Sequence, residues 1–493
     1  MGIPSIGRAS SGGIDNLQAA YSGAQASAEG GQYPNGNDPA NVAPAGSSAA
    51  QSLPWPPGVA GELAQYIYDT APRPVPEVAI AATLGLLAGV CGRAFTISDK
   101  GLNLYILLIA RSGIGKEAMH RGINDLLDMG DNEPAQRFAD FDDFASSPAL
   151  AKAVLDNPSF VNVVGEIGRR LKRMNRDSDK VMQEMRSQWT NLYEKSGAGD
   201  RVPGIRYSNA EDSRLGIRGA AYSLIGETTP ATFLEALTPD MAEDGFLSRF
   251  TMIEYDGARP PLNKDREADL LCLETWKALL VRALPYGKNI NVPERIQVAY
   301  EKDGEAERKL DAFGEECDQM INSTEDEWLR QMWNRAHMKA LKIAALLACA
   351  DNSVHPVINY RHASWALLLV RRDINTMTTR LNNGDVGMGD ATRETKLLKF
   401  CRDYIVKPLP ASYGVPASMH EIGIVPRLYL QKRANSTAAF HKHHLGTSFA
   451  LDKAIQGLIG NGHIMQVDKA KMVEAYSFHG DCYRLLNIPD GKK

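Results

Sequence analysis

A lysine that follows a glycine-rich turn is the residue of this chain with the most sharply defined chemistry. Residues 104–117 read LYILLIARSGIGKE, an apolar run that enters the turn and then a helical segment. Glycines free backbone N–H groups for phosphate oxygens, the next helix presents its positive end, and a lysine can bridge the outer phosphates. The pattern predicts a triphosphate site. Its predicted nucleotide-binding residues are Ser112, Gly113, Ile114, Gly115, Lys116, Glu117 and Ala118.

This turn departs from the pattern G-x-x-x-x-G-K-[ST] at two positions. Ala110 replaces the first glycine, and Glu117 replaces the hydroxyl residue that normally holds Mg²⁺. Mg²⁺ accepts one or two carboxylates together with phosphates and water, so Glu117 is the candidate metal ligand for an ATP–Mg²⁺ complex. The competing interpretation is a degenerate site that binds nucleotide and turns over slowly or not at all.

Two further candidates follow apolar runs. Glu166 comes after Phe160–Val164 and about fifty residues after Lys116, where a carboxylate would orient the attacking water. Thr229 precedes a proline at the end of the next run, where a hydroxyl can contact the γ-phosphate, with Thr228 as the fallback. The alternatives are a surface carboxylate for Glu166 and a helix N-cap for Thr229.

Arg249 stands directly before the apolar run Phe250–Tyr255. An arginine at this place can project into a neighbouring subunit's site, where it stabilises the charge of phosphoryl transfer. A structural salt bridge is the alternative.

The elements that must position these residues alternate along the chain. Apolar runs over 104–110, 160–164, 220–225 and 250–255 are typical of buried parallel strands, and helical segments separate them. This order predicts an α/β three-layer sandwich with the ligand at the carboxyl ends of the strands. Residues 268–381 are helical in pattern, and the last hundred residues predict short helices followed by two strands, 464–467 and 482–486, as in a winged helix.

Four blocks of sequence together resemble a known family: NLYILLIARSGIGKE, SSPALAKAVLDNPSFVNVVGEIGRRL, SLIGETTPATFLEAL and DGFLSRFTMIEY. They are similar to AAA+-like ATPases of phage and plasmid replication proteins, often described as helicase-primases. The SRF at 248–250 is also similar to the arginine-finger motif of minichromosome-maintenance helicases. The resemblance covers about residues 55–380 and implies a hexameric ring ATPase that acts on DNA in the bacterial host cytosol. It also implies a second sensing arginine, Arg335, in a helical lid.

The predicted domains follow from composition and from this resemblance. Residues 1–53 are rich in small polar residues and are expected to be disordered, without a primase-type metal motif. The remaining boundaries are a helical lead-in at 54–100, an AAA+-like core at 101–265, a helical lid at 266–381, a linker at 382–391 and a winged-helix domain at 392–493.

Basic residues mark the expected contacts with DNA. The chain has a net charge of −4, but 15 Lys/Arg against 8 Asp/Glu from Ala391 onward leave the body acidic. In ring ATPases the insertion before the third strand tends to form a hairpin that faces the pore, where single-stranded DNA would lie. Solvated surface charge and a protein-docking winged helix are the alternatives. The predicted DNA-binding residues are Lys172, Arg173, Arg201, Arg206, Arg427, Lys432, Arg433 and Lys442.

Other function classes are disfavoured. Six widely spaced cysteines, without a C-x-x-C pair, indicate reduced structural thiols. The most apolar run, 78–91, is too short to span a bilayer and predicts a buried helix, and no signal peptide is expected. The sequence thus predicts an ATP-dependent DNA helicase or translocase; the alternative is a non-hydrolysing, nucleotide-binding DNA-binding protein or helicase loader.

Overall fold

The computed structural model describes residues 52–130, 133–176, 178–206, 208–237, 241, 245–289, 292–302, 304–382, 390–407, 415–441 and 445–486. The segment expected to be disordered, 1–53, lies outside these residues except for its last two positions. Most of the expected linker at 382–391 lies outside them as well.

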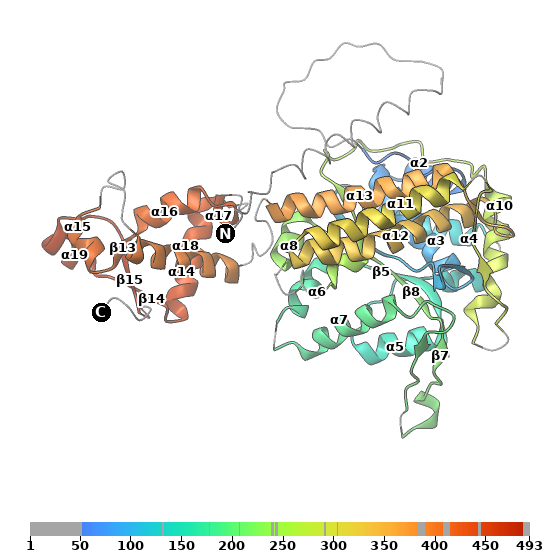
Figure 1. The fold of residues 1–493 in the computed structure, drawn as a ribbon, viewed down its shortest axis with the longest axis horizontal. Coiled ribbons are helices and arrows are strands. Elements are labelled where there is room, and N and C mark those ends of the chain that lie inside the picture. Colours follow the sequence, from blue (N-terminus) through green and yellow to red (C-terminus); the bar gives the residue numbers. More distant parts are fainter. Residues whose placement is uncertain are drawn as a thin grey trace, which may run out of the picture. The chain divides into compact units, whose positions relative to one another are not determined.

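A five-stranded, fully parallel sheet forms the centre of residues 52–382, in the order β4-β5-β8-β3-β9 (Figure 1). Its strands are β3 Tyr105–Ala110, β4 Ala139–Asp140, β5 Ser159–Val164, β8 Ala221–Thr228 and β9 Phe250–Tyr255. The four predicted apolar runs are confirmed as strands, and the protein is of the mixed α/β class. The strand that precedes Lys116 lies between β8 and β9 rather than at an edge.

Both faces of this sheet are covered. Along β3, Ile106, Leu108 and Ala110 belong to one hydrophobic cluster, whereas Tyr105, Leu107 and Ile109 belong to another. Successive side chains of a strand point to opposite faces, so a run that is apolar at every position requires helices on both sides. The long helices on the first face are α2 Val59–Thr70, α3 Pro76–Cys91, α4 Glu117–Asp128 and α10 Leu273–Ala283.

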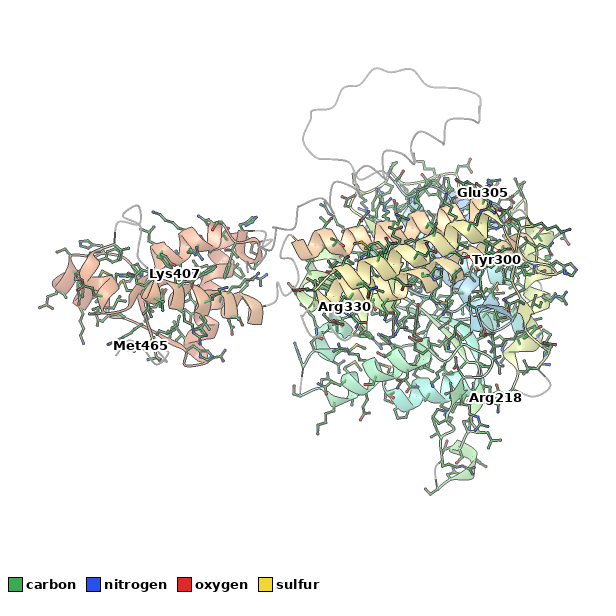
Figure 2. All side chains as sticks on the ribbon, in the orientation of Figure 1. Arg218, Tyr300, Glu305, Arg330, Lys407 and Met465 are labelled. Carbon is green, nitrogen blue, oxygen red and sulfur yellow. The ribbon has the colours of Figure 1, made fainter. Side chains whose placement is uncertain are left out.

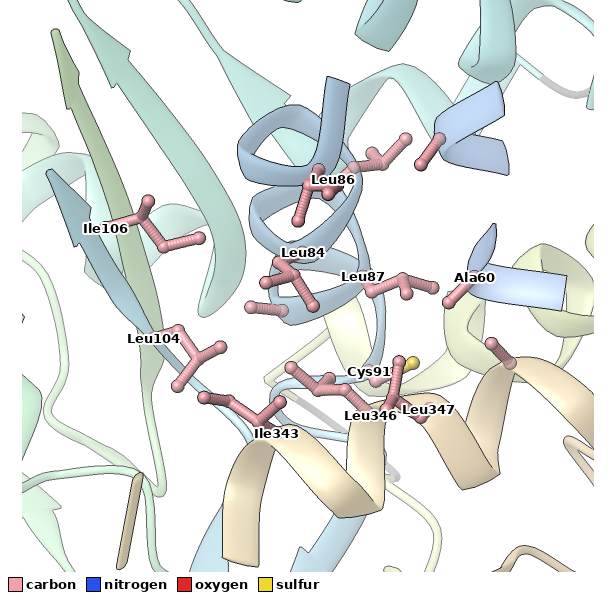
Figure 3. Packing of buried hydrophobic residues seen from close by; sticks show 14 of the residues in the cluster. Ala60, Leu84, Leu86, Leu87, Cys91, Leu104, Ile106, Ile343, Leu346 and Leu347 are labelled. Carbon is pink, nitrogen blue, oxygen red and sulfur yellow. The ribbon is translucent and has the colours of Figure 1, made fainter. Parts of the chain in front are cut away.

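Helix α3 lies against the sheet, contacting β5, β8, β3 and β9. In Figure 3 its Leu84, Leu86 and Leu87 pack among Ile106 of β3, Ile343 of α12 (Glu327–Asp351) and Ala60 of α2. Glycines allow the close approach: a Cβ added at Gly89 would lie 2.5 Å from the Phe138 carbonyl oxygen. The apolar run at 78–91 is therefore a buried helix, as predicted.

The opposite face is covered by α5 Ser147–Asp156, α6 Ile167–Met174, α7 Lys180–Tyr193 and α8 Pro230–Ala236. Helix α7 was not expected, since its residues were assigned to a polar insertion. After α7 the chain forms a hairpin, β6 Arg201–Val202 with β7 Ile217–Arg218, which projects from the body of the domain (Figure 1). This hairpin confirms the expected form of the insertion before β8.

Three long helices form an antiparallel bundle: α11 Glu305–Ser323, α12 Glu327–Asp351 and α13 Tyr360–Asn382. Their buried residues join the same cluster as α3 and the sheet, so the bundle shares the core of the sheet. Short elements complete this part of the chain: β1 Phe95–Ile97, β2 Lys100–Gly101, β10 Ile296–Gln297, β11 Ala299–Tyr300, β12 Val357–Ile358, and short 3-10 helices over Glu133–Phe138, Ala210–Asp212, Leu247–Arg249 and Leu284–Gly287.

Residues 390–486 have their own hydrophobic clusters. The helices are α14 Asp390–Val406, α15 Ala417–Glu421, α16 Arg427–Asn435, α17 Ala438–His441, α18 Thr447–Gly460 and α19 Lys469–Tyr476. An antiparallel sheet of order β13-β15-β14 joins Ile424–Pro426, Cys482–Leu485 and Ile464–Gln466. The two predicted strands are confirmed, and β13 and α19 were not expected. Among the helices of the described residues, none has both the length and the apolarity to cross a bilayer.

Candidate functional site

The loop Arg111–Lys116, here called the Lys116 loop, joins the carboxyl end of β3 to the start of α4. Gly113 (φ 74°) and Gly115 (φ 112°) have positive φ angles, which side chains disfavour. A Cβ at Gly115 would lie 2.5 Å from the Arg73 carbonyl oxygen, whereas one at Gly113 would meet nothing within 4 Å. The loop thus packs on the Arg73 segment at one glycine and is open at the other. This geometry can expose backbone N–H groups to an anion.

Lys116 pairs with a carboxylate of the neighbouring strand. Its Nζ lies 3.7 Å from Oε2 of Glu227, near the end of β8, and both side chains are mostly buried, with 16% and 17% exposed. Oε2 of Glu227 is inaccessible and accepts no hydrogen bond. The pair is therefore held by charge attraction alone, and neither group is committed to a close hydrogen bond with the other.

This pair lies between two neighbouring strands whose connections leave on opposite faces of the sheet. The chain leaves β3 for α4 on one face, and it leaves the adjacent β8 for α8 on the other. When neighbouring parallel strands exit to opposite faces, their carboxyl ends leave a crevice, and ligands of open α/β sheets bind there. Lys116 and Glu227 meet across this crevice.

Glu166 lies one strand further along the same edge. It follows β5 in a left-handed conformation (φ 49°), its side chain is 66% exposed, and its Oε2 pairs with Nε of Arg169 at 2.8 Å. Glu166 and Gly165 line a cleft of about 460 Å³ together with Asp143, Arg170 and Arg173. The strand order therefore places the carboxylate of Glu227, and not that of Glu166, beside Lys116.

The two threonines after β8 have local partners. Thr229 is the N-cap of α8, where its Oγ1 accepts a hydrogen bond from the Thr232 N–H at 3.3 Å and lies 2.9 Å from Thr232 Oγ1. Thr228 is buried, and its Oγ1 donates to the Thr229 carbonyl oxygen. The N-cap alternative describes the contacts of Thr229.

Arg249 and Arg335 lie together at the other end of the parallel strands, where the strands begin; this end is here called the amino edge, and the end with Lys116 the carboxyl edge. Arg249 precedes β9 and Lys116 follows β3, and these strands are parallel, so about 20 Å of strand separates them. Arg249 is 8% exposed, donates from Nη1 to the Gly245 carbonyl oxygen, and lies 3.5 Å from Oε1 of Glu194. Arg335 of α12 pairs with the same oxygen at 2.8 Å. Neither arginine reaches the Lys116 loop of its own chain.

Burial dominates the electrostatics of this cluster. It holds the pKa of Arg249 below the ordinary value; the nearby Arg335 adds to the shift and Glu194 opposes it. One carboxylate thus balances the charge of two guanidinium groups. Nε of each arginine is inaccessible to solvent and has no hydrogen-bond partner. In this arrangement Arg249 faces the interior of its own chain.

The remaining residues of the Lys116 loop differ in exposure. Ser112, Gly113 and Glu117 are exposed, whereas Ile114, Gly115 and Ala118 are buried. Glu117 is the first residue of α4, and its side chain is exposed to solvent. Among the described residues no cluster of three His, Cys, Asp or Glu side chains could hold a metal ion by itself. Mg²⁺ does not need one when phosphates and water complete its shell, so one or two carboxylates at this edge suit it.

The predicted DNA-binding residues fall into two groups. Lys172 pairs with Glu235, Arg173 with Asp179 and Arg427 with Asp452, while Arg433 lies over the Phe400 ring near Asp403. Arg201, Arg206 and Lys432 are exposed, the first two on the hairpin. Lys442 lies outside the described residues.

The hairpin brings two arginines together. Arg201 of β6 is directly opposite Arg218 of β7 in the strand register, and both are exposed (Figure 2 labels Arg218). Neither forms an ion pair with any other residue that the structure describes. Like charges at facing positions destabilise a strand pair unless an anion lies between them. The hairpin is therefore a candidate anion-binding surface.

Sequence reasoning missed two acidic residues, Glu227 and Glu194. A signal existed for Glu227, because VVGE at 163–166 and LIGE at 224–227 are the same arrangement of an apolar pair, glycine and glutamate. Only the strand order decides which glutamate adjoins Lys116. Glu194 carried no such signal, since it follows a helix that was not expected.

Comparison of the chain with models of protein families gives no match, and comparison with curated protein sequences gives none either.

Proposed function

We propose that this protein is a P-loop ATPase of the AAA+-like class that acts on DNA as a helicase or translocase in phage or plasmid replication. The observation that carries the proposal is the Lys116 loop. It combines two glycines of positive φ, of which Gly113 is exposed, with a mostly buried lysine. The loop lies next to the crevice between two parallel strands whose connections leave on opposite faces of the sheet. These are the requirements of a triphosphate cradle at a helix start.

In the proposed mechanism the chain's own groups bind and orient. Backbone N–H groups of residues 112–117 and the start of α4 hold the phosphates, and Lys116 neutralises the β- and γ-phosphates. Mg²⁺ would be held by carboxylates at this edge of the sheet and would neutralise phosphate charge when bound. Glu166 and Glu227 are the carboxylates at the same edge that can polarise a water molecule.

The position of Arg249 supports an oligomeric ring, proposed as a hexamer. This arginine is about 20 Å from its own Lys116 loop, so it can contact a nucleotide only on a neighbouring subunit. Such a contact requires that Arg249 leave Glu194. Arg335 shares that partner and that edge, so its proposed sensing role also applies to the neighbour's nucleotide.

Two surfaces support DNA as the partner. The hairpin presents Arg201 and Arg218 side by side, which suits a phosphate backbone. Residues 390–486 combine α14, α16 and α18 with a three-stranded antiparallel sheet, an arrangement that fits a winged helix. Lys432 is exposed on α16 of this domain.

DNA-stimulated ATP hydrolysis by the full chain tests the proposal. Wild type should hydrolyse ATP faster with single-stranded DNA, Lys116→Ala should lose at least about 90% of that rate, and Arg249→Ala should lose a comparable part. Lys302→Ala, which removes an exposed lysine from a distant turn, serves as the matched control and should keep the wild-type rate. Equal rates in all four proteins would exclude the ATPase function.

A non-hydrolysing nucleotide-binding DNA-binding or loader protein is the second candidate. P-loop NTPases normally hold Mg²⁺ with an aspartate at the end of a strand, and this chain has Gly165 at that place, before Glu166. That departure and the ion pair of Glu166 with Arg169 favour the second candidate. The same experiment separates the two: ATP binding that depends on Lys116, without turnover by wild type, identifies the second candidate.

A further inference from the structure

The carboxylate of Glu227 occupies the space between the Lys116 loop and the end of β5. Its Oε2 lies 3.7 Å from Lys116 Nζ, and its Oε1 lies 3.6 Å from where a Cβ at Gly165 would be. The register pairs Glu227 with Leu108 of β3 and the preceding Gly226 with Val164 of β5. Glu227 is thus the acidic side chain that reaches both strands of the crevice.

Gly165 leaves that space open. A side chain at this position would adjoin the carboxylate of Glu227 at ordinary contact distance, and the φ angle of Gly165 is not in the left-handed region. A carboxylate from β5 would therefore lie about where the carboxylate from β8 now lies. One acidic group is supplied to the crevice, and it comes from β8 instead of β5.

We infer that Glu227 is the acidic residue through which this site depends on Mg²⁺, replacing a carboxylate at position 165. The inference rests on the proposed function. It assigns Glu227 one role before nucleotide binds and another afterwards. Before nucleotide binds, Glu227 is the counter-ion of Lys116. When a triphosphate takes Lys116, the carboxylate is left facing the phosphates and suits a divalent cation there.

The two other acidic candidates are less well placed. Glu166 is paired with Arg169 and directed to α6, and Glu117 is exposed at the first turn of α4. Neither forms an ion pair with Lys116, whereas Glu227 does. Glu315 is exposed on α11, outside the site, so Glu315→Gln removes one carboxylate charge elsewhere and serves as the matched control.

The charge of Glu227 should affect nucleotide affinity in opposite directions with and without Mg²⁺. Without Mg²⁺, Glu227 competes with the phosphates for Lys116 and repels them. With Mg²⁺, the same carboxylate contributes to binding. Removing its charge should therefore strengthen nucleotide binding in EDTA and remove most of the gain that Mg²⁺ provides.

The test measures equilibrium binding of a fluorescent ATP analogue to the full chain, in Mg²⁺ and in EDTA. For wild type and the control Glu315→Gln, we expect Kd to be at least about tenfold lower in Mg²⁺. For Glu227→Gln, we expect the ratio of the two Kd values to fall to within about twofold of one, with tighter binding in EDTA than wild type. Gly165→Asp in the Glu227→Gln background should restore the Mg²⁺ dependence.

Each result has one consequence. If Glu227→Gln keeps the wild-type ratio, or if Glu315→Gln loses it, the inference is wrong while the proposed function stands. If wild type binds no nucleotide in either buffer, the proposed function fails and the inference fails with it. Loss of binding by Lys116→Ala identifies the measured site as the Lys116 loop.

Discussion

Single charged residues at the two edges of the sheet have contrasting environments. At the carboxyl edge, Lys116 has a partner at 3.7 Å that it can exchange for a phosphate. At the amino edge, Glu194 pairs with Arg249 and Arg335 together, and burial makes an uncompensated guanidinium costly. The carboxyl edge can therefore accept an anion by giving up one loose ion pair, whereas the amino edge must first break the closer contacts of its buried arginines.

Lys342 lies close to the cluster of Arg249, Arg335 and Glu194, and it makes the free energy of unfolding depend on pH. It is buried in α12, donates hydrogen bonds to the carbonyl oxygen and Oδ1 of Asn103, and lies 4.8 Å from the centroid of the Tyr193 ring. Burial lowers the pKa of Lys342 from 10.5 to about 7. Between these two values the unfolded chain binds the proton and the folded chain does not. The free energy of unfolding should therefore rise with pH in this range.

We expect this contribution to approach about 1 kcal/mol per pH unit between roughly pH 7 and pH 9, and to be flat below about pH 6. Urea unfolding of wild type and Lys342→Met at several pH values measures it, because the difference between the two proteins cancels every other titrating group. A difference independent of pH would mean that Lys342 keeps its charge in the folded state.

Among the elements, the strands and long helices were predictable, and the contacts between them were not. The runs at 160–164 and 250–255 predict β5 and β9 because strands covered on both faces are apolar throughout. Helix α7 was missed because its sequence KVMQEMRSQWTNLY is mostly polar, and only Met182, Met185, Trp189, Leu192 and Tyr193 are buried. Periodicity was present there, but the surrounding charges obscured it.

The same limit applies to the candidate site. The Lys116 loop is local in sequence and could be predicted from its residue types. Its partner Glu227 is 111 positions later, and pairing the two requires knowing that β8 lies next to β3. Sequence spacing favoured Glu166 because it ends an apolar run about fifty residues after Lys116. Strand order, which depends on long-range packing, favours Glu227.

Glycine at position 89 determines how closely α3 approaches the sheet. A Cβ there would lie 2.5 Å from the Phe138 carbonyl oxygen and 2.7 Å from the Val161 nitrogen, both backbone atoms that cannot move independently. Gly89→Ala should lower the free energy of unfolding by about 1–3 kcal/mol in urea titrations. Gly199→Ala, with no atom within 4 Å of the added carbon, should change it by less than about 0.5 kcal/mol.

The hairpin has an expected signature in salt. If Arg201 and Arg218 contact phosphates, replacing both with alanine should reduce the magnitude of the slope of log K against log salt by about 1.4 for single-stranded DNA. Fluorescence anisotropy with labelled DNA at several salt concentrations measures this slope. The double variant Lys302→Ala/Arg361→Ala removes the same number of exposed charges elsewhere and should keep the wild-type slope. Equal slopes in all three proteins would assign the hairpin another role.

At the scale of the whole molecule, the sheet separates the two halves of the proposed site. Lys116 and Arg249 stand at opposite ends of adjacent parallel strands, so one chain cannot bring both to the same nucleotide. A heterologous ring contact, in which one surface meets a different surface of the next subunit, places an amino edge against a carboxyl edge. The complete site would then belong to the interface.

Mixing two inactive variants tests this arrangement. Lys116→Ala and Arg249→Ala each lack one half of every site. In a mixed ring, an interface is complete when one variant supplies the intact lysine and the other supplies the intact arginine. Random mixing makes about one interface in four complete. We therefore expect an equimolar mixture to recover up to about a quarter of the wild-type ATPase rate. Recovery should require that the subunits exchange before assay, since preformed homogeneous rings contain no complete interface. If exchange is verified by fluorescence and the mixture stays as inactive as its components, Arg249 does not act across an interface, and its pairing with Glu194 is structural.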